Sequence, residues 1–134
     1  MQTIDFVKKS TTNTFVEIES KSSEKRLPYT EIKTLVKTAR ELVSILSSSL
    51  TVEQRMDHSD FFKESTEKLK AIESDLQIAL TNSLEKKDYK AHFSLSNTYK
   101  DVVGLKKQMY VPIDVKQLGE EIKRLGGYGT VNLV

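Results

Sequence analysis

Residues 86–107 combine six lysines with aromatic residues, a pattern that could bind phosphate groups. The residues assigned to this candidate surface are Lys86, Lys87, Lys90, Tyr99, Lys100, Lys106 and Lys107. Two aspartates oppose the six lysines, which leaves a local excess of four positive charges. Lysines neutralise phosphates, and aromatic rings stack on bases. The segment therefore indicates a nucleic-acid-binding face.

The same segment also has a purely structural interpretation. In that interpretation Tyr89, Phe93 and Tyr99 face the core, and the lysines are ordinary solvated residues of a helix. The segment contains no arginine, which disfavours specific base recognition because arginine is the side chain most used for it. The two interpretations differ in whether the aromatic rings are exposed.

The two histidines do not form a recognisable metal site. Asp57, His58 and Asp60 lie close together in the sequence, but structural zinc needs four protein ligands and catalytic zinc three. We expect the residues from Asp57 to Asp60 to cap a helix start instead. His92 lies beside an aromatic residue and is expected at the surface or boundary of a helix.

Other polar patterns also favour structural roles. Glu64 and Glu67 lie among lysines, whereas general acid–base catalysis needs carboxylates in a cleft that separates their pKa values. The glycine cluster at 126–129 follows a predicted helix, whereas phosphate-binding loops precede one. The sequence thus predicts no enzyme, no cofactor and no bound metal.

Composition narrows the class of protein further. The chain has 134 residues, a formal net charge of +2 and no cysteine. This length suits one domain, and the charge is far from that of a dedicated nucleic-acid-binding protein. No apolar run approaches the roughly 20 residues of a membrane span, and the N-terminus does not resemble a signal peptide. We therefore expect a cytoplasmic protein that does not bind membranes.

Helices must position these residues, because no glycine or proline occurs between Tyr29 and Val103. Apolar residues at helical spacing predict helices from Pro28 to about 49, from about 59 to 84, from about 89 to 110 and from 114 to 125. Thr51 and Gln54 form a capping-box pattern. The apolar stripe of the third helix is expected to be Phe93, Ser96, Tyr99, Val103 and Tyr110, and whether this helix is continuous through 94–98 stays open. The expected core residues are Leu35, Leu42, Leu69, Ile72, Leu76 and Ile122.

The two ends of the chain look extended. Residues 14–20 alternate between apolar and acidic side chains, which predicts a strand, and residues 3–8 could be helix or strand. Residues 130–134 are also extended in character. The tail residues expected to dock on a partner are Tyr128, Val131, Leu133 and Val134.

The predicted fold is mainly α: a three- to four-helix bundle with a small β element from the terminal segments. Residues 1–134 form one domain, with an extended segment at 1–27, the bundle at 28–126 and an extended tail at 127–134. Short helices with one apolar stripe bury that stripe against each other, which is the reason for a bundle.

These features predict a non-enzymatic protein-interaction module, such as an adaptor, an assembly subunit or an inhibitor. Its expected partner is another protein or a second copy of the chain, which would make it an oligomer. The alternative is a nucleic-acid-binding accessory subunit that uses the basic face of residues 86–107. An origin in a phage or another mobile element is a further hypothesis, suggested by small size, composition and the lack of motifs.

Overall fold

Five helices make up most of the chain in the computed structural model, which describes residues 2–111. They are α1 (Gln2–Ser22), α2 (Tyr29–Ser49), α3 (Val52–Asp57), α4 (Ser59–Glu85) and α5 (Tyr89–Gln108). Helices cover 86% of the described residues, which is also more than half of the whole chain. The mainly α prediction is therefore confirmed.

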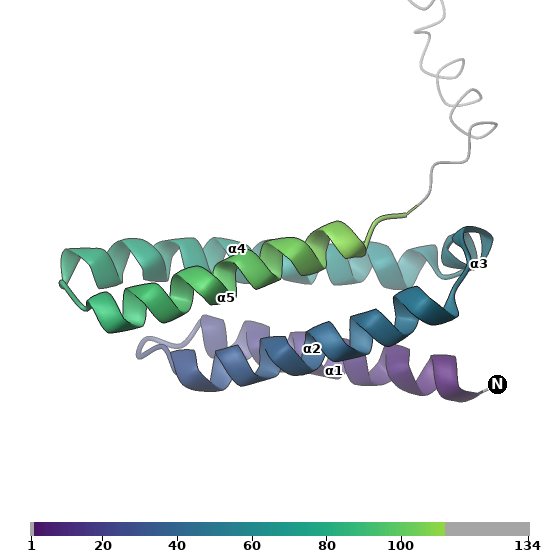
Figure 1. Cartoon of the computed structure of the whole chain (residues 1–134), viewed down its shortest axis with the longest axis horizontal. Coiled ribbons are helices and arrows are strands. Elements are labelled where there is room, and N and C mark those ends of the chain that lie inside the picture. Colours follow the sequence, from purple (N-terminus) through teal and green to yellow (C-terminus); the bar gives the residue numbers. More distant parts are fainter. Residues whose placement is uncertain (1, 112–134) are drawn as a thin grey trace, which may run out of the picture.

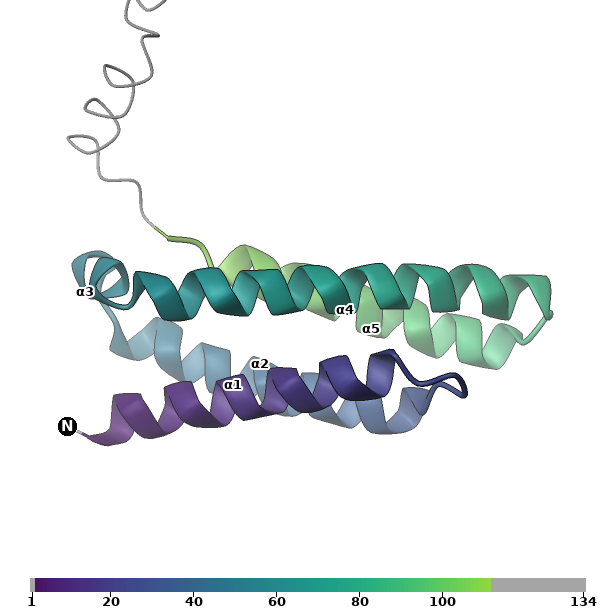
Figure 2. The ribbon, with the colours of Figure 1, turned by 180° about the vertical axis from the view of Figure 1, so that it is seen from behind.

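The four long helices pack as two helical hairpins laid against each other (Figures 1 and 2). α1 packs against α2 and α4, and α5 packs against α4 and α2. The turns of both hairpins lie at one end, and the N-terminus, α3 and the end of α5 lie at the other. The predicted helical-bundle character is confirmed. The predicted helix at 114–125 lies outside the described residues.

The hairpins are also staggered. α4 has 27 residues and α1 has 21, and in Figure 1 the α4–α5 turn extends well past the α1–α2 loop. The tip of the α4–α5 hairpin therefore lacks cover from the other hairpin. The predicted basic segment, residues 86–107, begins at this tip.

The predicted strand at 14–20 is wrong, because these residues belong to α1. The strand pattern required Val16 and Ile18 to share a face, but they lie two residues apart and thus about 200° apart around a helix. Accordingly, Val16 is 46% exposed and Ile18 is 1% exposed. Residues 3–8 are helical too. No strand forms between residues 2 and 111, and the segment at 130–134 lies outside that range.

Polar residues on its buried face explain why the sequence pattern does not predict α1 as a helix. Its buried face includes Thr11 and Thr14, which interrupt the apolar period that marks a helix. Each hydroxyl donates to the carbonyl four residues earlier, at 2.7 Å from Val7 and 2.8 Å from Ser10. These bonds satisfy the hydroxyls locally, so threonine can replace an apolar residue on the buried face.

The core runs along the inside of all four long helices. Of the six predicted core residues, Leu69, Ile72 and Leu76 are fully buried, as expected. Leu35 is partly buried and packs against the core, and Leu42 is partly buried as well. Ile122 lies outside the described residues.

The predicted phase of α5 is wrong by about one residue. The expected stripe was Phe93, Ser96, Tyr99, Val103 and Tyr110, whereas the buried residues are Ala91, Leu95, Thr98, Val102 and Leu105. The sequence interpretation placed the aromatic side chains inside, but α5 packs against α2 and α4 with aliphatic residues, Thr98 and Ala91 instead. α5 is also continuous through 94–98.

The turns follow the local sequence closely. The Thr51 hydroxyl accepts from the Gln54 backbone, and the Gln54 side chain accepts from the Thr51 backbone, which confirms the capping box. The start of α4 lies within the segment 57–60 that was predicted to cap a helix, but His58 is the N-cap and its side chain makes no capping bond. At the opposite end of the bundle, Lys21 Nζ donates to Oε2 of Glu31 at 2.7 Å, and this contact joins α1 to α2. This hydrogen bond raises the pKa of Lys21.

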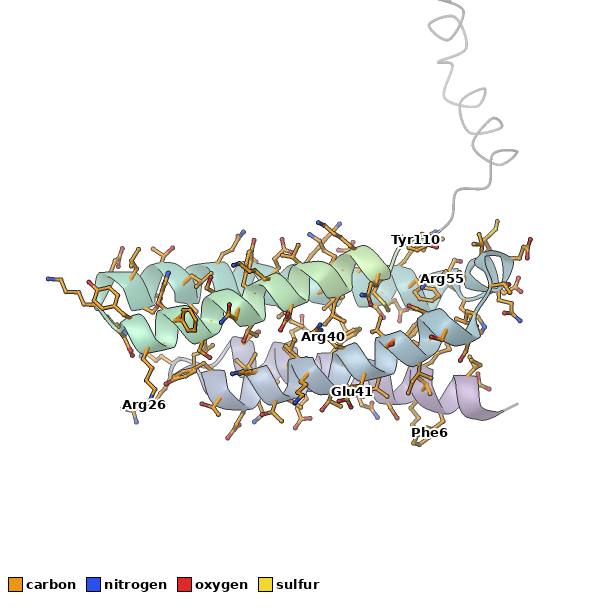
Figure 3. All side chains as sticks on the ribbon, viewed as in Figure 1. Phe6, Arg26, Arg40, Glu41, Arg55 and Tyr110 are labelled. Carbon is orange, nitrogen blue, oxygen red and sulfur yellow. The ribbon has the colours of Figure 1, made fainter. Side chains whose placement is uncertain are left out.

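The buried Arg55 joins the connector, which is the short helix α3 between the two hairpins, to the end of α5. Arg55 is 5% exposed and its guanidinium lies between the rings of Phe62 and Tyr110, at 4.8 and 4.5 Å from the ring centroids. It donates to the carbonyls of Gln108 and Tyr110 at 2.9 and 3.3 Å, and to the Ser47 hydroxyl at 3.1 Å. Figure 3 shows Arg55 beside Tyr110 at this end. The positive side chain thus satisfies the carbonyls that end α5.

Candidate binding surface on α5

The outward side of α5 carries the two most exposed aromatic residues of the basic segment. Tyr89 is 62% exposed and Phe93 is 71% exposed. Together with Lys100 and Lys107 they follow the spacing i, i+4, i+11 and i+18, which places all four on one side of the helix. The interpretation in which these two rings face the core is therefore wrong.

Two of the predicted site residues face α4 instead of solvent. The Tyr99 hydroxyl accepts from Nε2 of Gln77 at 2.8 Å. Lys106 Nζ lies 2.8 Å from Oε2 of Glu73, and the two side chains are only 29% and 18% exposed. This contact is an ion pair rather than an aligned hydrogen bond, since Oε2 has no hydrogen-bond partner. Tyr99 and Lys106 thus join α5 to α4.

Cations from α2 extend the basic surface, and the sequence interpretation missed them. Arg40 Nη1 lies 3.5 Å from Oδ1 of Asp101 on α5, and Figure 3 shows Arg40 between the two helices. Lys33 and Lys37 precede Arg40 by seven and three residues, so they share its side of α2. The spacing of these three residues was visible in the sequence, but the neighbouring position of α5 was not.

We name this surface the α5 face. It consists of the exposed side chains of Lys33, Lys37, Arg40, Tyr89, Lys90, Phe93, Lys100 and Lys107. Lys90 belongs to it because it lies eleven residues before Asp101, the residue that faces α2. Among residues 2–111, no acidic side chain forms an ion pair with its lysines. The α5 face is therefore a positive strip with two exposed rings near one end.

The two remaining predicted lysines form the turn between α4 and α5. The Asp88 backbone donates to the Ser83 carbonyl at 2.9 Å, and the Lys87 backbone donates to the Leu84 carbonyl at 3.1 Å. This pair of bonds is a Schellman motif, which requires a left-handed residue that is usually glycine. Here that residue is Lys87, with φ of 58°. A lysine therefore occupies a position where the backbone favours glycine.

Replacing Lys87 by glycine is expected to raise the free energy of unfolding by roughly 0.5–1 kcal/mol, because glycine adopts the left-handed conformation without strain. Thermal unfolding measures the change. Lys86→Gly is the matched control: Lys86 has φ of −81°, so glycine there is expected to lower stability. A lower melting temperature for Lys87→Gly would contradict the turn geometry described above.

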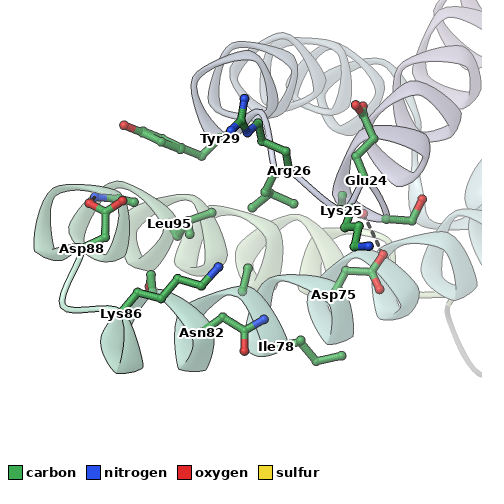
Figure 4. Close-up of a pocket in the computed structure, with 16 residues that line it drawn as sticks. Glu24, Lys25, Arg26, Tyr29, Asp75, Ile78, Asn82, Lys86, Asp88 and Leu95 are labelled. Carbon is green, nitrogen blue, oxygen red and sulfur yellow. Dashed lines mark hydrogen bonds between the residues drawn. The ribbon is translucent and has the colours of Figure 1, made fainter.

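A pocket of about 640 Å³ lies between the α1–α2 loop and the part of the α4–α5 hairpin that extends past it. Leu27, Ala79 and Leu95 line its apolar part. Figure 4 shows Lys86 extending from the end of α4 toward the α1–α2 loop, which carries Arg26. The pocket exists because α4 continues past the end of α1, and its cations lie close to the tip of the α5 face.

The one serine–histidine pair that borders this pocket is structural. His92 Nδ1 lies 3.1 Å from the Leu80 carbonyl and 3.1 Å from the Ser83 hydroxyl. A carbonyl only accepts, so the bond to Leu80 assigns the hydrogen to Nδ1. The Ser83 hydroxyl itself donates to Leu80 at 2.9 Å. His92 is therefore not placed to accept the serine proton through Nδ1, and the pair joins the ends of α4 and α5.

The second histidine also takes part in packing. Lys8 Nζ donates to Nδ1 of His58 at 2.9 Å and lies 5.5 Å from the centroid of the Phe61 ring. These contacts join α1 to the start of α4. In the described part of the chain, no group of three histidine, aspartate or glutamate residues is arranged to hold a metal ion.

No protein-family model, curated protein or solved structure matches the chain. The fold and the surface together define the class of protein: a helical bundle with a positively charged face that exposes two aromatic rings. None of the helices between residues 2 and 108 has the length and apolar character needed to cross a membrane. The predicted docking residues Tyr128, Val131, Leu133 and Val134 lie outside the described residues and stay a prediction.

Proposed function

We propose that this protein is a non-enzymatic interaction module that binds a negatively charged partner through the α5 face. The observation that carries the proposal is the exposure of Tyr89 and Phe93 beside lysines that form no ion pair within residues 2–111. Such a module would act as an adaptor or assembly subunit in the cytoplasm.

The exposed rings support a binding role because exposure of large apolar groups is unfavourable in water. Scattered apolar residues are normal on protein surfaces, but grouped ones mark interaction sites. Tyr89 and Phe93 are one helical turn apart, and the buried side of α5 uses neither ring. A partner that covers both rings would remove this unfavourable exposure.

The use of polar groups elsewhere supports binding over catalysis. The buried Arg55, the Ser83–His92 pair and the Glu73–Lys106 pair all connect one helix to the next. The charges of the α5 face, in contrast, point to solvent along α2 and α5. Solvent-facing charge of one sign attracts and orients an oppositely charged partner.

Retention on heparin, a polyanion without bases, tests the proposal. Replacing Lys90 and Lys100 by glutamine is expected to lower the salt concentration at which the protein elutes, because each lysine that contacts an anion adds to the salt dependence. The matched control replaces Lys9 and Lys63, which are exposed lysines of α1 and α4, and removes the same net charge. Equal shifts for both pairs would show that net charge alone drives retention, and the proposal would be wrong.

A further inference from the structure

We infer that the partner of the α5 face is a single-stranded nucleic acid, bound without sequence preference. This inference rests on the proposed function, because it names the partner of the same surface. It depends on three properties of the surface: the rings, the rows of cations and the kind of cation.

The rings are placed to stack on unpaired bases. Tyr89 and Phe93 are four residues apart, so they are separated by about 6 Å along the axis of α5. Both are more than half exposed, and neither makes a hydrogen bond or aromatic contact within residues 2–111. Every base offers a flat π-face, so aromatic side chains on a positive groove bind single strands of any sequence. In a duplex the bases are already stacked on each other, and the rings would gain nothing.

The cations form two rows that could follow a phosphate backbone. Lys33 and Lys37 lie along α2, and Lys90, Lys100 and Lys107 lie along the neighbouring α5. From Lys90 to Lys107 the row extends about 25 Å at the rise of an α-helix. A strand laid along α5 could therefore contact Lys90, Lys100 and Lys107 in turn and place two bases on the rings at the hairpin tip.

The kind of cation favours binding without sequence readout. Lysine contacts phosphate as a point charge, whereas arginine is the usual side chain for reading base edges. The one arginine of the α5 face, Arg40, lies against Asp101 at 3.5 Å. The α5 face thus carries five lysines and one arginine, and that arginine already has a carboxylate beside it.

Fluorescence anisotropy with a labelled oligothymidylate of roughly 16 nucleotides, the upper end of common site sizes, tests the inference. The double variant Tyr89→Ala/Phe93→Ala is expected to bind the oligonucleotide about 100-fold more weakly, or about tenfold for each ring. Its elution from heparin is expected to stay unchanged, because heparin has no bases. A duplex of the same length is expected to bind more weakly than the single strand.

The matched control is Phe6→Ala/Val16→Ala, which removes two exposed apolar side chains from α1. Both oligonucleotide binding and heparin elution are expected to match the parent protein. Circular dichroism and melting temperature check that both double variants fold like the parent. If the control weakened oligonucleotide binding as much as the Tyr89/Phe93 variant, the rings would have no special role and the inference would fail.

The outcomes separate this inference from the proposed function. If oligonucleotide binding does not depend on the rings, or if the duplex binds as tightly, the inference is overturned, while lysine-dependent heparin binding would still support the proposed function. Ring-dependent binding of polyglutamate without binding of the oligonucleotide would also overturn it and assign the face to an acidic protein. If heparin retention does not depend on Lys90 and Lys100, the proposed function itself fails.

Discussion

Replacing Phe62 by alanine is expected to lower the free energy of unfolding by about 3–5 kcal/mol, the usual effect of removing a fully buried ring. Phe62 is 0% exposed and belongs to the central core cluster. Its ring meets Phe61 edge-on at a centroid distance of 5.2 Å and supports the guanidinium of Arg55 on its face. The substitution therefore leaves a cavity and also removes a support of the connector.

Urea unfolding followed by circular dichroism measures this loss, and Phe93→Ala is the matched control. The same side chain is removed there, but Phe93 is 71% exposed, so a change within about 0.5 kcal/mol is expected, as for most surface substitutions. Similar losses at both positions would mean that the buried side of α5 is assigned wrongly. The comparison thus tests the burial pattern on which the α5 face depends.

Replacing Arg55 by alanine is expected to lower the free energy of unfolding by about 3–5 kcal/mol, because each buried acceptor left without a partner costs about 1–3 kcal/mol. The guanidinium satisfies two backbone carbonyls and a hydroxyl, and buried polar groups without partners are unfavourable. The side chain also fills the space between Phe62 and Tyr110. The loss combines unsatisfied acceptors with lost packing.

Two further variants separate these contributions in urea unfolding. Arg55→Lys keeps the charge but loses the planar fork that reaches three acceptors and stacks on two rings, so it is expected to fall between the parent and Arg55→Ala. Arg40→Ala removes an arginine whose side chain is 58% exposed and whose ion pair is on the surface, so it is expected to cost less than about 1 kcal/mol. A small effect of Arg55→Ala, similar to that of Arg40→Ala, would contradict the role assigned to the connector.

The stability variants and the binding variants affect different parts of the molecule. Phe62 lies inside the bundle, and Arg55 lies at the end of the bundle that carries α3. Tyr89 and Phe93 lie at the free tip of the α4–α5 hairpin, which extends past the other hairpin (Figure 1). Substitutions at the tip are therefore expected to change binding while the fold stays intact.

Most of the local structure follows from residue order alone. The capping box at Thr51 and the helices α2, α4 and α5 depend on contacts within a few residues, and these are visible in residue order. Leu69, Ile72 and Leu76 were found in the core because α4 keeps a regular apolar period. In α1, Thr11 and Thr14 interrupt the apolar period of the buried face, and the pattern of residues 14–20 therefore predicts a strand instead of a helix.

Tertiary packing decided which side of each helix is inside and which residues meet. The size of the aromatic residues of α5 predicts them inside, but the side of α5 that packs against α2 and α4 carries Ala91, Leu95, Thr98, Val102 and Leu105 instead. The approach of α2 to α5, where Arg40 pairs with Asp101, brings Lys33 and Lys37 onto the same surface as lysines that lie more than fifty residues away in the chain. Such a neighbour depends on how hairpins pack and not on local spacing, and so the α5 face was only partly visible in the sequence.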